Sequence, residues 1–302
     1  MDIMSLINAL PGAAAQGLIW GIMAIGVYLT FRILDVADLT VDGTMCTGGA
    51  VCIMMLMSGQ NIWVSMLAAT GLATGIFHTV MGIPAILAGI LTQLGLYSVN
   101  LKIMGKANQA VNSSKYDLLV SLRNIKDVPF YQNTILIVAV FIVILIAVLY
   151  WFFGTEIGCS LRATGCNPNM SRAQGINTDF AKVLGLMISN GLVALSSAFL
   201  AQYQGFADVN MGRGAIVIGL AAVIIGEAVF GKIFRNFALR LFSVALGSIL
   251  YYLVLQAVIW MGIDTDLLKL LSALVVAVFL AVPYWKAKYF AKPMKRGGNT
   301  NA

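Results

Sequence analysis

Charged residues are scarce in this chain. Asp, Glu, Lys and Arg together make up 10% of the sequence, whereas soluble domains usually carry about 25%. Hydrophobic residues make up 60%, and apolar stretches of about 20 residues, the length that crosses a bilayer core, recur from one end to the other. This composition excludes a water-soluble globular protein and leaves no room for a large soluble domain.

Side chains that could catalyse a reaction or bind a metal are also rare. The chain has one histidine, His78, and four cysteines that form no CxxC pair and have no histidine nearby. Neither a zinc site nor a redox motif is supported, and no cluster of acids or nucleophiles indicates an embedded enzyme. We therefore expect no catalytic residue, no metal site and four free thiols, at Cys46, Cys52, Cys159 and Cys166.

The chain also lacks a phosphate-binding loop. Many ATP-hydrolysing chains carry the pattern GxxxxGK[ST], but the two Gly-Lys pairs of this sequence are followed by Ala107 and Ile233. We expect no cofactor in the chain itself. Any work that this protein does must be driven by another chain or by an ion gradient.

The apolar runs predict an all-α, polytopic membrane protein with one domain over residues 1–302. The run at 43–58 is short, and the run at 83–101 is interrupted by polar residues and glycine, as broken or re-entrant spans of transporter cores often are. The first run lacks a basic leader and a cleavage site, so we interpret it as a retained span. Nine spans are predicted, at 13–33, 43–58, 61–81, 83–101, 132–153, 180–202, 212–231, 237–260 and 267–285.

The basic residues predict the orientation of these spans. The tail at 286–302 begins KAKYFAKPMKR, and a basic segment beside a span usually marks the cytoplasmic face rather than nucleic-acid binding. The C-terminus is then cytoplasmic, in the inner or plasma membrane with lipid around it. An odd number of spans places the N-terminus outside, the loop 102–131 outside and the loop 155–179 inside.

The cytoplasmic loop 155–179 is longer than a simple helix connection. Its pattern predicts a short helix over 160–164, a turn at the Asn-Pro pair, and a second short helix that is capped by Asn169 or Ser171 and ended by Gly175. A compact helical hairpin at a membrane surface is typical of a docking site for a partner, although an amphipathic connector would show the same pattern.

The loop also carries a family resemblance. The run LRATGCNPNMSRAQGI at 161–176 resembles the cytoplasmic coupling segment of branched-chain amino-acid and ribose-type ABC permeases, whose pattern is close to L-R-A-x-G-x-N-x-x-A-A-R-x-x-G-I. The resemblance covers most of the chain, including 34–50, 84–95 and 212–231, and is strongest to permeases for tryptophan or tyrosine uptake. With Ser160 just before them, the matching residues are Leu161, Arg162, Ala163, Gly165, Asn167, Arg172, Gly175 and Ile176.

The resemblance implies the permease subunit of an ABC importer for a small organic solute, an amino acid and in particular an aromatic one. It implies three partners: an ABC ATPase subunit that binds ATP and Mg²⁺ and docks on the coupling segment, an extracytoplasmic solute-binding protein, and a second permease copy in a homodimer. The alternative is a secondary transporter driven by an ion gradient, for which inverted repeats and intramembrane charges would be expected.

Polar residues in the spans allow two interpretations. They either line a solute path or join helices by hydrogen bonds, and this choice stays open for Thr92, Gln93, Asn100 and Gln202.

Charged residues near the span ends allow similar pairs of interpretations. Asp38 or Asp42 caps the helix at 43–58 or lies beside a solute path. Glu227 is expected to form an ion pair with Lys232 or Arg235, and the alternative is a role in a proton relay. Arg162 and Arg172 either contact the ATPase or anchor the chain at lipid headgroups.

Overall fold

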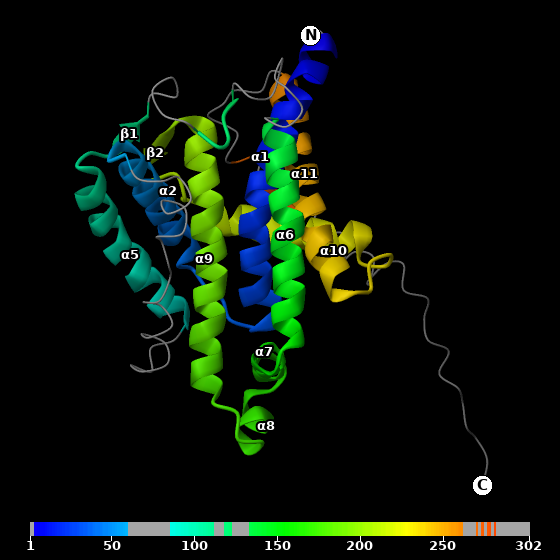
Figure 1. The fold of residues 1–302 in the computed structure, drawn as a ribbon. Coiled ribbons are helices and arrows are strands. Elements are labelled where there is room, and N and C mark those ends of the chain that lie inside the picture. The colour runs from blue at the N-terminus through cyan, green and yellow to red at the C-terminus, as the bar shows by residue number, and fades with distance from the viewer. Residues whose placement is uncertain are drawn as a thin grey trace, which may run out of the picture.

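The computed structural model describes residues 3–59, 85–111, 118–122 and 133–261, with single positions between 270 and 281. This part of the chain is almost entirely helical, as the composition predicted (Figure 1). The predicted span 61–81, most of 267–285 and the basic tail lie outside the described residues.

Five helices of the described part are long and apolar enough to cross a membrane. The first continues through a π-helical turn, η1 (Leu29–Ile33), and packs against four other described helices, α6, α9, α10 and α11, near the centre of the bundle. The prediction for 237–260 is confirmed at both ends. The five helices are α1 (Ile3–Tyr28), α5 (Ala85–Met104), α6 (Thr134–Gly154), α9 (Thr178–Gln204) and α11 (Phe237–Trp260).

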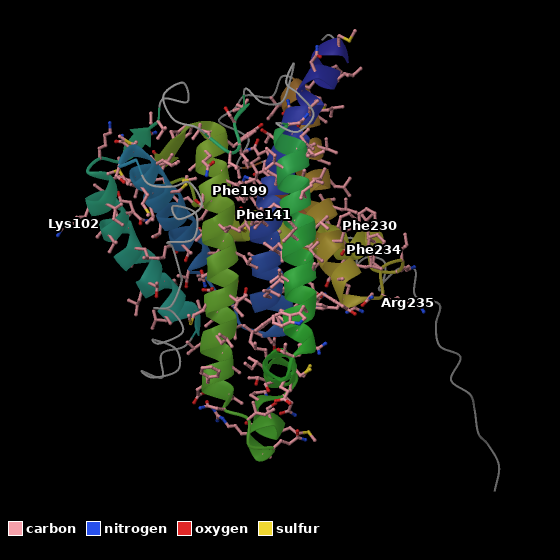
Figure 2. The ribbon with its side chains drawn as sticks, viewed as in Figure 1. Lys102, Phe141, Phe199, Phe230, Phe234 and Arg235 are labelled. Carbon is pink, nitrogen blue, oxygen red and sulfur yellow. The ribbon has the colours of Figure 1, made fainter. Side chains whose placement is uncertain are left out.

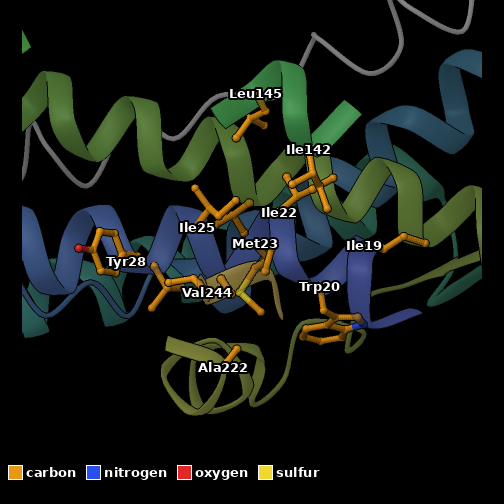
Figure 3. Packing of buried hydrophobic residues seen from close by; sticks show 14 of the residues in the cluster. Ile19, Trp20, Ile22, Met23, Ile25, Tyr28, Ile142, Leu145, Ala222 and Val244 are labelled. Carbon is orange, nitrogen blue, oxygen red and sulfur yellow. The ribbon is translucent and has the colours of Figure 1, made fainter. Parts of the chain in front are cut away.

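Apolar side chains and small residues hold this bundle together. In Figure 3, Ile22 and Met23 of α1 lie among side chains of α6, α10 and α11. Phe141 of α6 meets Phe199 of α9 edge to face, with ring centroids 4.9 Å apart (Figure 2). Close backbone contacts add to this packing, because a methyl group at Gly48 would overlap the Ala194 carbonyl of α9.

Two shorter helices, α2 (Val41–Met57) and α10 (Ala215–Phe230), begin inside the bundle. The Thr44 hydroxyl in the first turn of α2 donates to Oδ1 of Asn190, at 2.8 Å, near the middle of α9. The first turn of α10 contacts Asp42 at the same level. From this level α2 runs along α9 and α10 runs along α1, an arrangement typical of the discontinuous helices of transporters.

The structure corrects two expectations about regular structure. The expected interruption of 83–101 is wrong, since α5 is continuous and Thr92 donates its hydroxyl to the Ala88 carbonyl of the preceding turn, at 2.8 Å. A two-stranded antiparallel sheet was not predicted. In it β1 (Asn108–Ala110) pairs with β2 (Phe206–Asp208), at the end of the bundle opposite α7 and α8 (Figure 1).

Candidate functional site

The loop 155–179 folds into two helices, α7 (Glu156–Cys166) and α8 (Pro168–Ala173), which project beyond the lower end of the bundle in Figure 1. Thr155 caps α7 by accepting the Gly158 N–H at 3.3 Å. The first helix therefore starts four residues before the predicted one.

Asn167 caps α8 by accepting the Met170 N–H at 3.1 Å, so the predicted caps at Asn169 and Ser171 are wrong. The reason is Pro168, which has no N–H to leave unpaired and whose fixed φ suits the first helical position. Gly175 ends the helix as predicted. Its φ is +82°, and its N–H donates to the Arg172 carbonyl at 2.9 Å.

Helix α7 is packed tightly against the bundle. Leu161 is 1% exposed, and its side chain lies beside Leu34 and Gly185. Gly165 lies directly under the Ile33 carbonyl at the end of η1, where a methyl group would overlap that oxygen. A displacement of α7 must therefore be transmitted to η1 and α9.

Helix α8 is connected to the start of α9 by one arginine. Nε of Arg172 donates to Oγ1 of Thr178 at 2.7 Å, and Nη2 donates to Oδ1 of Asp179 at 3.1 Å. Met170 of α8 is 62% exposed. The hairpin thus combines a fixed attachment to the bundle with an exposed apolar side chain at its tip.

A cavity of about 240 Å³ lies between α2, α5 and the segment that connects β2 to α10. The first turn of α2 forms its inner end, and α5 forms one wall. Its lining residues are Asp42, Gly43, Cys46, Gln93, Leu94, Tyr97, Asn100, Val209 and Arg213.

Two carboxylates near this cavity, that of buried Asp38 and that of half-buried Asp42, do not cap α2, which has no side-chain cap. Asp42 instead caps α10, because the N–H groups of Gly214 and Ile216 donate to its two oxygens at 2.9 Å and 3.0 Å. Asp38 accepts the Thr40 N–H at 2.9 Å and Nδ2 of Asn190 at 2.6 Å. The prediction was wrong because Asp42 accepts N–H groups of another helix, while Asp38 bonds Thr40, just before α2, and Asn190 of α9.

A family model described as "Branched-chain amino acid transport system / permease component" matches residues 10–282. The chain belongs to this permease family. It is therefore a multi-pass membrane protein and a transport component rather than an enzyme, and the family resemblance predicted from the loop is confirmed.

Individual relatives support the same assignment. A tyrosine transport system permease protein of Clostridioides difficile is 39% identical over 272 residues, which cover 88% of each chain. The uncharacterized protein RP368 of Rickettsia prowazekii is 34% identical over 91% of this chain and 97% of its own. The fructose import permease protein FruF of Bifidobacterium longum is 26% identical over 86% of this chain and 73% of its own. No solved structure matches significantly.

The residues predicted to couple the permease to an ATPase lie in two environments. Leu161 is buried, whereas Ser160, Gly165 and Ile176 are half-buried and face the bundle or their own helix. The exposed ones are Arg162, Ala163, Asn167, Arg172 and Gly175.

The four residues predicted to line a solute path also differ in their surroundings. Gln93 and Asn100 line the cavity, and Thr92 bonds within α5. Gln202 is buried between elements, where its Oε1 accepts the Leu119 N–H at 3.2 Å and its Nε2 donates to Sγ of Cys52 at 3.5 Å. Gln202 therefore joins parts of the fold and Thr92 is satisfied within its own helix, while Gln93 and Asn100 face a space that a solute could enter.

Glu227 forms an ion pair that the sequence did not reveal. Nε of Arg32 donates to both of its carboxylate oxygens, at 3.0 Å and 3.2 Å, and Nη2 donates to Oε2. The expected partners were Lys232 and Arg235, which are close in sequence. The pair instead joins α10 to η1, 195 residues away.

Proposed function

We propose that this permease is the membrane-spanning subunit of an ABC importer that moves an aromatic amino acid into the cell. The observation that carries this proposal is the exposed α7–α8 hairpin, which is packed onto η1 and α9. A separate ATPase subunit, which binds ATP and Mg²⁺, would dock on this hairpin. A solute-binding protein outside the cell and a second copy of the permease would complete the importer.

The hairpin is suited to transmit force because its two sides differ. Its inner side is fixed by Leu161, Gly165 and Arg172, so it moves as one body with the helices beneath it. Its outer side presents Met170, a flexible apolar side chain of the kind that fits irregular grooves. ATP-driven closure of the ATPase pair would press on the outer side and displace α9 and η1.

The arginines of the permease support a proposed orientation. A cavity of about 350 Å³ beside α7 is lined by four of them, at Arg32, Arg162, Arg235 and Arg240. Basic residues concentrate on the cytoplasmic side of membrane proteins. We therefore place α7, α8 and the C-terminus in the cytoplasm and the permease in the inner or plasma membrane.

The solute assignment rests on the relative described as a tyrosine transport permease, which is similar over most of its length. The alternative is uptake driven by an ion gradient. The discontinuous helices α2 and α10 are compatible with it, but family membership favours the importer.

A pull-down tests the importer assignment. The tagged permease is purified in mild detergent after crosslinking, and co-eluting proteins are identified by mass spectrometry. Met170→Asp, which places a charge at the tip of α8, is compared with Met261→Asp at the far end of α11, where the methionine is 57% exposed. We expect an ABC ATPase with the parent and with Met261→Asp, and much less with Met170→Asp.

The same preparation separates the importer from its alternative. No ATPase with the parent chain after crosslinking, together with tyrosine uptake that needs an ion gradient and no ATP, would refute the importer. Arg172→Glu is less suitable as a docking variant, because it also removes the contacts with Thr178 and Asp179.

A further inference from the structure

We propose that the cavity between α2, α5 and residues 209–214 binds the charged amino and carboxylate groups of a free amino acid. The permease would then select its solute itself, in addition to any selection by a binding protein. This inference rests on the proposed function, because it names the solute class and the residues that recognise it.

Asn100 of α5 provides the first observation. Its side chain is fully buried and lines the cavity, yet neither Oδ1 nor Nδ2 has a hydrogen-bond partner among the described residues. Buried amide groups are rarely left unpaired in native structures. A ligand that carries both a donor and an acceptor would satisfy this amide.

Two side chains of opposite charge line the same cavity. Arg213 precedes α10 and can hold a carboxylate through two parallel hydrogen bonds. Each oxygen of Asp42 accepts one backbone N–H, and a carboxylate oxygen can accept a second bond, here from an ammonium group. A free amino acid carries both charges, whereas a neutral sugar offers neither a carboxylate for Arg213 nor an ammonium group for Asp42.

Helix ends add to this charge pattern. The first turn of α2, with Asp42 and Gly43, forms the inner end of the cavity, and a helix N-terminus favours an anionic group. Asp42 already supplies an anionic group in this turn, so the carboxylate of the solute would point toward Arg213. Its ammonium group would lie between Asp42 and the amide oxygen of Asn100.

The remaining lining suits a hydrophobic or aromatic solute side chain. Leu94, Tyr97 and Val209 form an apolar and aromatic wall. The volume of about 240 Å³ is below the roughly 300–1,000 Å³ of pockets for drug-sized ligands, so the cavity is suited to a single small molecule. It extends from the middle of the bundle toward the sheet, on the side away from α7 and α8.

Equilibrium binding tests this inference on the full-length permease in lipid nanodiscs. Radiolabelled L-tyrosine is competed with tyramine, which lacks the carboxylate, with 4-hydroxyphenylpropionate, which lacks the amine, and with fructose. We expect tyrosine to bind, each analogue to compete at least tenfold more weakly, and fructose to have no effect.

Variants assign the binding to this cavity. Asn100→Leu and Arg213→Gln are each expected to weaken tyrosine binding at least tenfold. The matched control is Lys102→Gln, which changes an exposed residue of the same helix that does not line the cavity (Figure 2). If Asn100→Leu does not fold, Arg213→Gln, which changes an exposed side chain of the same lining, still tests the cavity.

The failure of this inference can be distinguished from failure of the proposed function. Analogues that compete as well as tyrosine, fructose that competes, or cavity variants with parental affinity would each overturn the inference, while co-elution of the ATPase would be unaffected. Conversely, tyrosine binding that depends on Asn100 and Arg213 supports the cavity even if no ATPase co-elutes.

Discussion

At the scale of single residues, the two carboxylates beside the start of α2 are bonded to backbone N–H groups and to a neighbouring side-chain amide. Asp42 caps a helix that begins 172 residues later in the sequence. Asp38, which is 3% exposed, is held by Asn190 and by the Thr40 N–H. Such groups are costly in a membrane protein unless they are paired, and here each pair fixes the start of a short helix.

The cap at α10 gives the first prediction. Asp42→Ala removes the acceptors of the Gly214 and Ile216 amides, and unpaired buried amides cost about 1–3 kcal/mol. We expect a clearly lower midpoint of thermal unfolding in detergent and a smaller loss for Asp42→Asn, which retains one acceptor. Glu156→Ala, at an exposed position of α7, serves as the control. Equal midpoints for Asp42→Ala and this control would contradict the cap.

The ion pair between Arg32 and Glu227 gives the second prediction. Its side chains are 51% and 29% exposed, so water and salt weaken the attraction, and such pairs contribute about 0.2–1 kcal/mol. Because the Arg32 guanidinium contacts both carboxylate oxygens of Glu227, we expect a value near the upper end of that range. A double-mutant cycle with Arg32→Gln and Glu227→Gln should show a coupling energy of this size that falls as salt is added. If the changes in unfolding free energy of the two single variants simply add in the double variant, the ion pair is contradicted.

At the scale of helices, α2 and α9 are held together by close backbone contact. A methyl group at Gly48 would overlap the Ala194 carbonyl, whereas one at Gly191 of α9 would meet nothing within 4 Å. We expect Gly48→Ala to reduce the amount of folded permease that survives gel filtration after heating. Gly191→Ala should match the parent or exceed it, because alanine favours helix more than glycine does. Similar losses for both variants would contradict the packing.

The helices also show how far sequence reasoning reaches. Residues 237–260 were predicted at both ends because a continuous apolar run begins after Asn236 and ends before a polar stretch. The start of α8 was missed, although the Asn-Pro pair at 167–168 was a readable signal. The continuity of α5 was not readable, because Thr92 satisfies its hydroxyl within the helix and so does not break it.

The candidate site was less predictable than the helices. Gln93 and Asn100 were identified from their polarity in an apolar run. Arg213 was missed because it lies in the connection between β2 and α10. It reaches the cavity only when that connection folds back to α2. Partners 150 to 200 residues apart, such as Arg32 with Glu227, depend on how helices pack, and no local pattern encodes that.

At the scale of the whole molecule, the hairpin and the sheet lie at opposite ends of the described bundle (Figure 1), so the proposed importer needs them on opposite sides of the membrane. The proposals for ATPase docking and for solute entry both require the hairpin to be cytoplasmic. The cysteines provide a natural probe of this orientation. Cys159 and Cys166 of α7 are exposed, whereas Cys46 and Cys52 of α2 are buried.

A membrane-impermeant maleimide should therefore label the permease in inside-out vesicles and leave it unlabelled in right-side-out vesicles. The variant with Cys159→Ser and Cys166→Ser controls for the site, since it should lose the labelling of the inside-out vesicles, and any label that remains would report Cys46, which lines the cavity. Labelling from the outer side would place α7 and α8 outside the cell. An ATPase could not reach them there, so that single result would overturn the docking proposal and reverse the side from which the cavity fills.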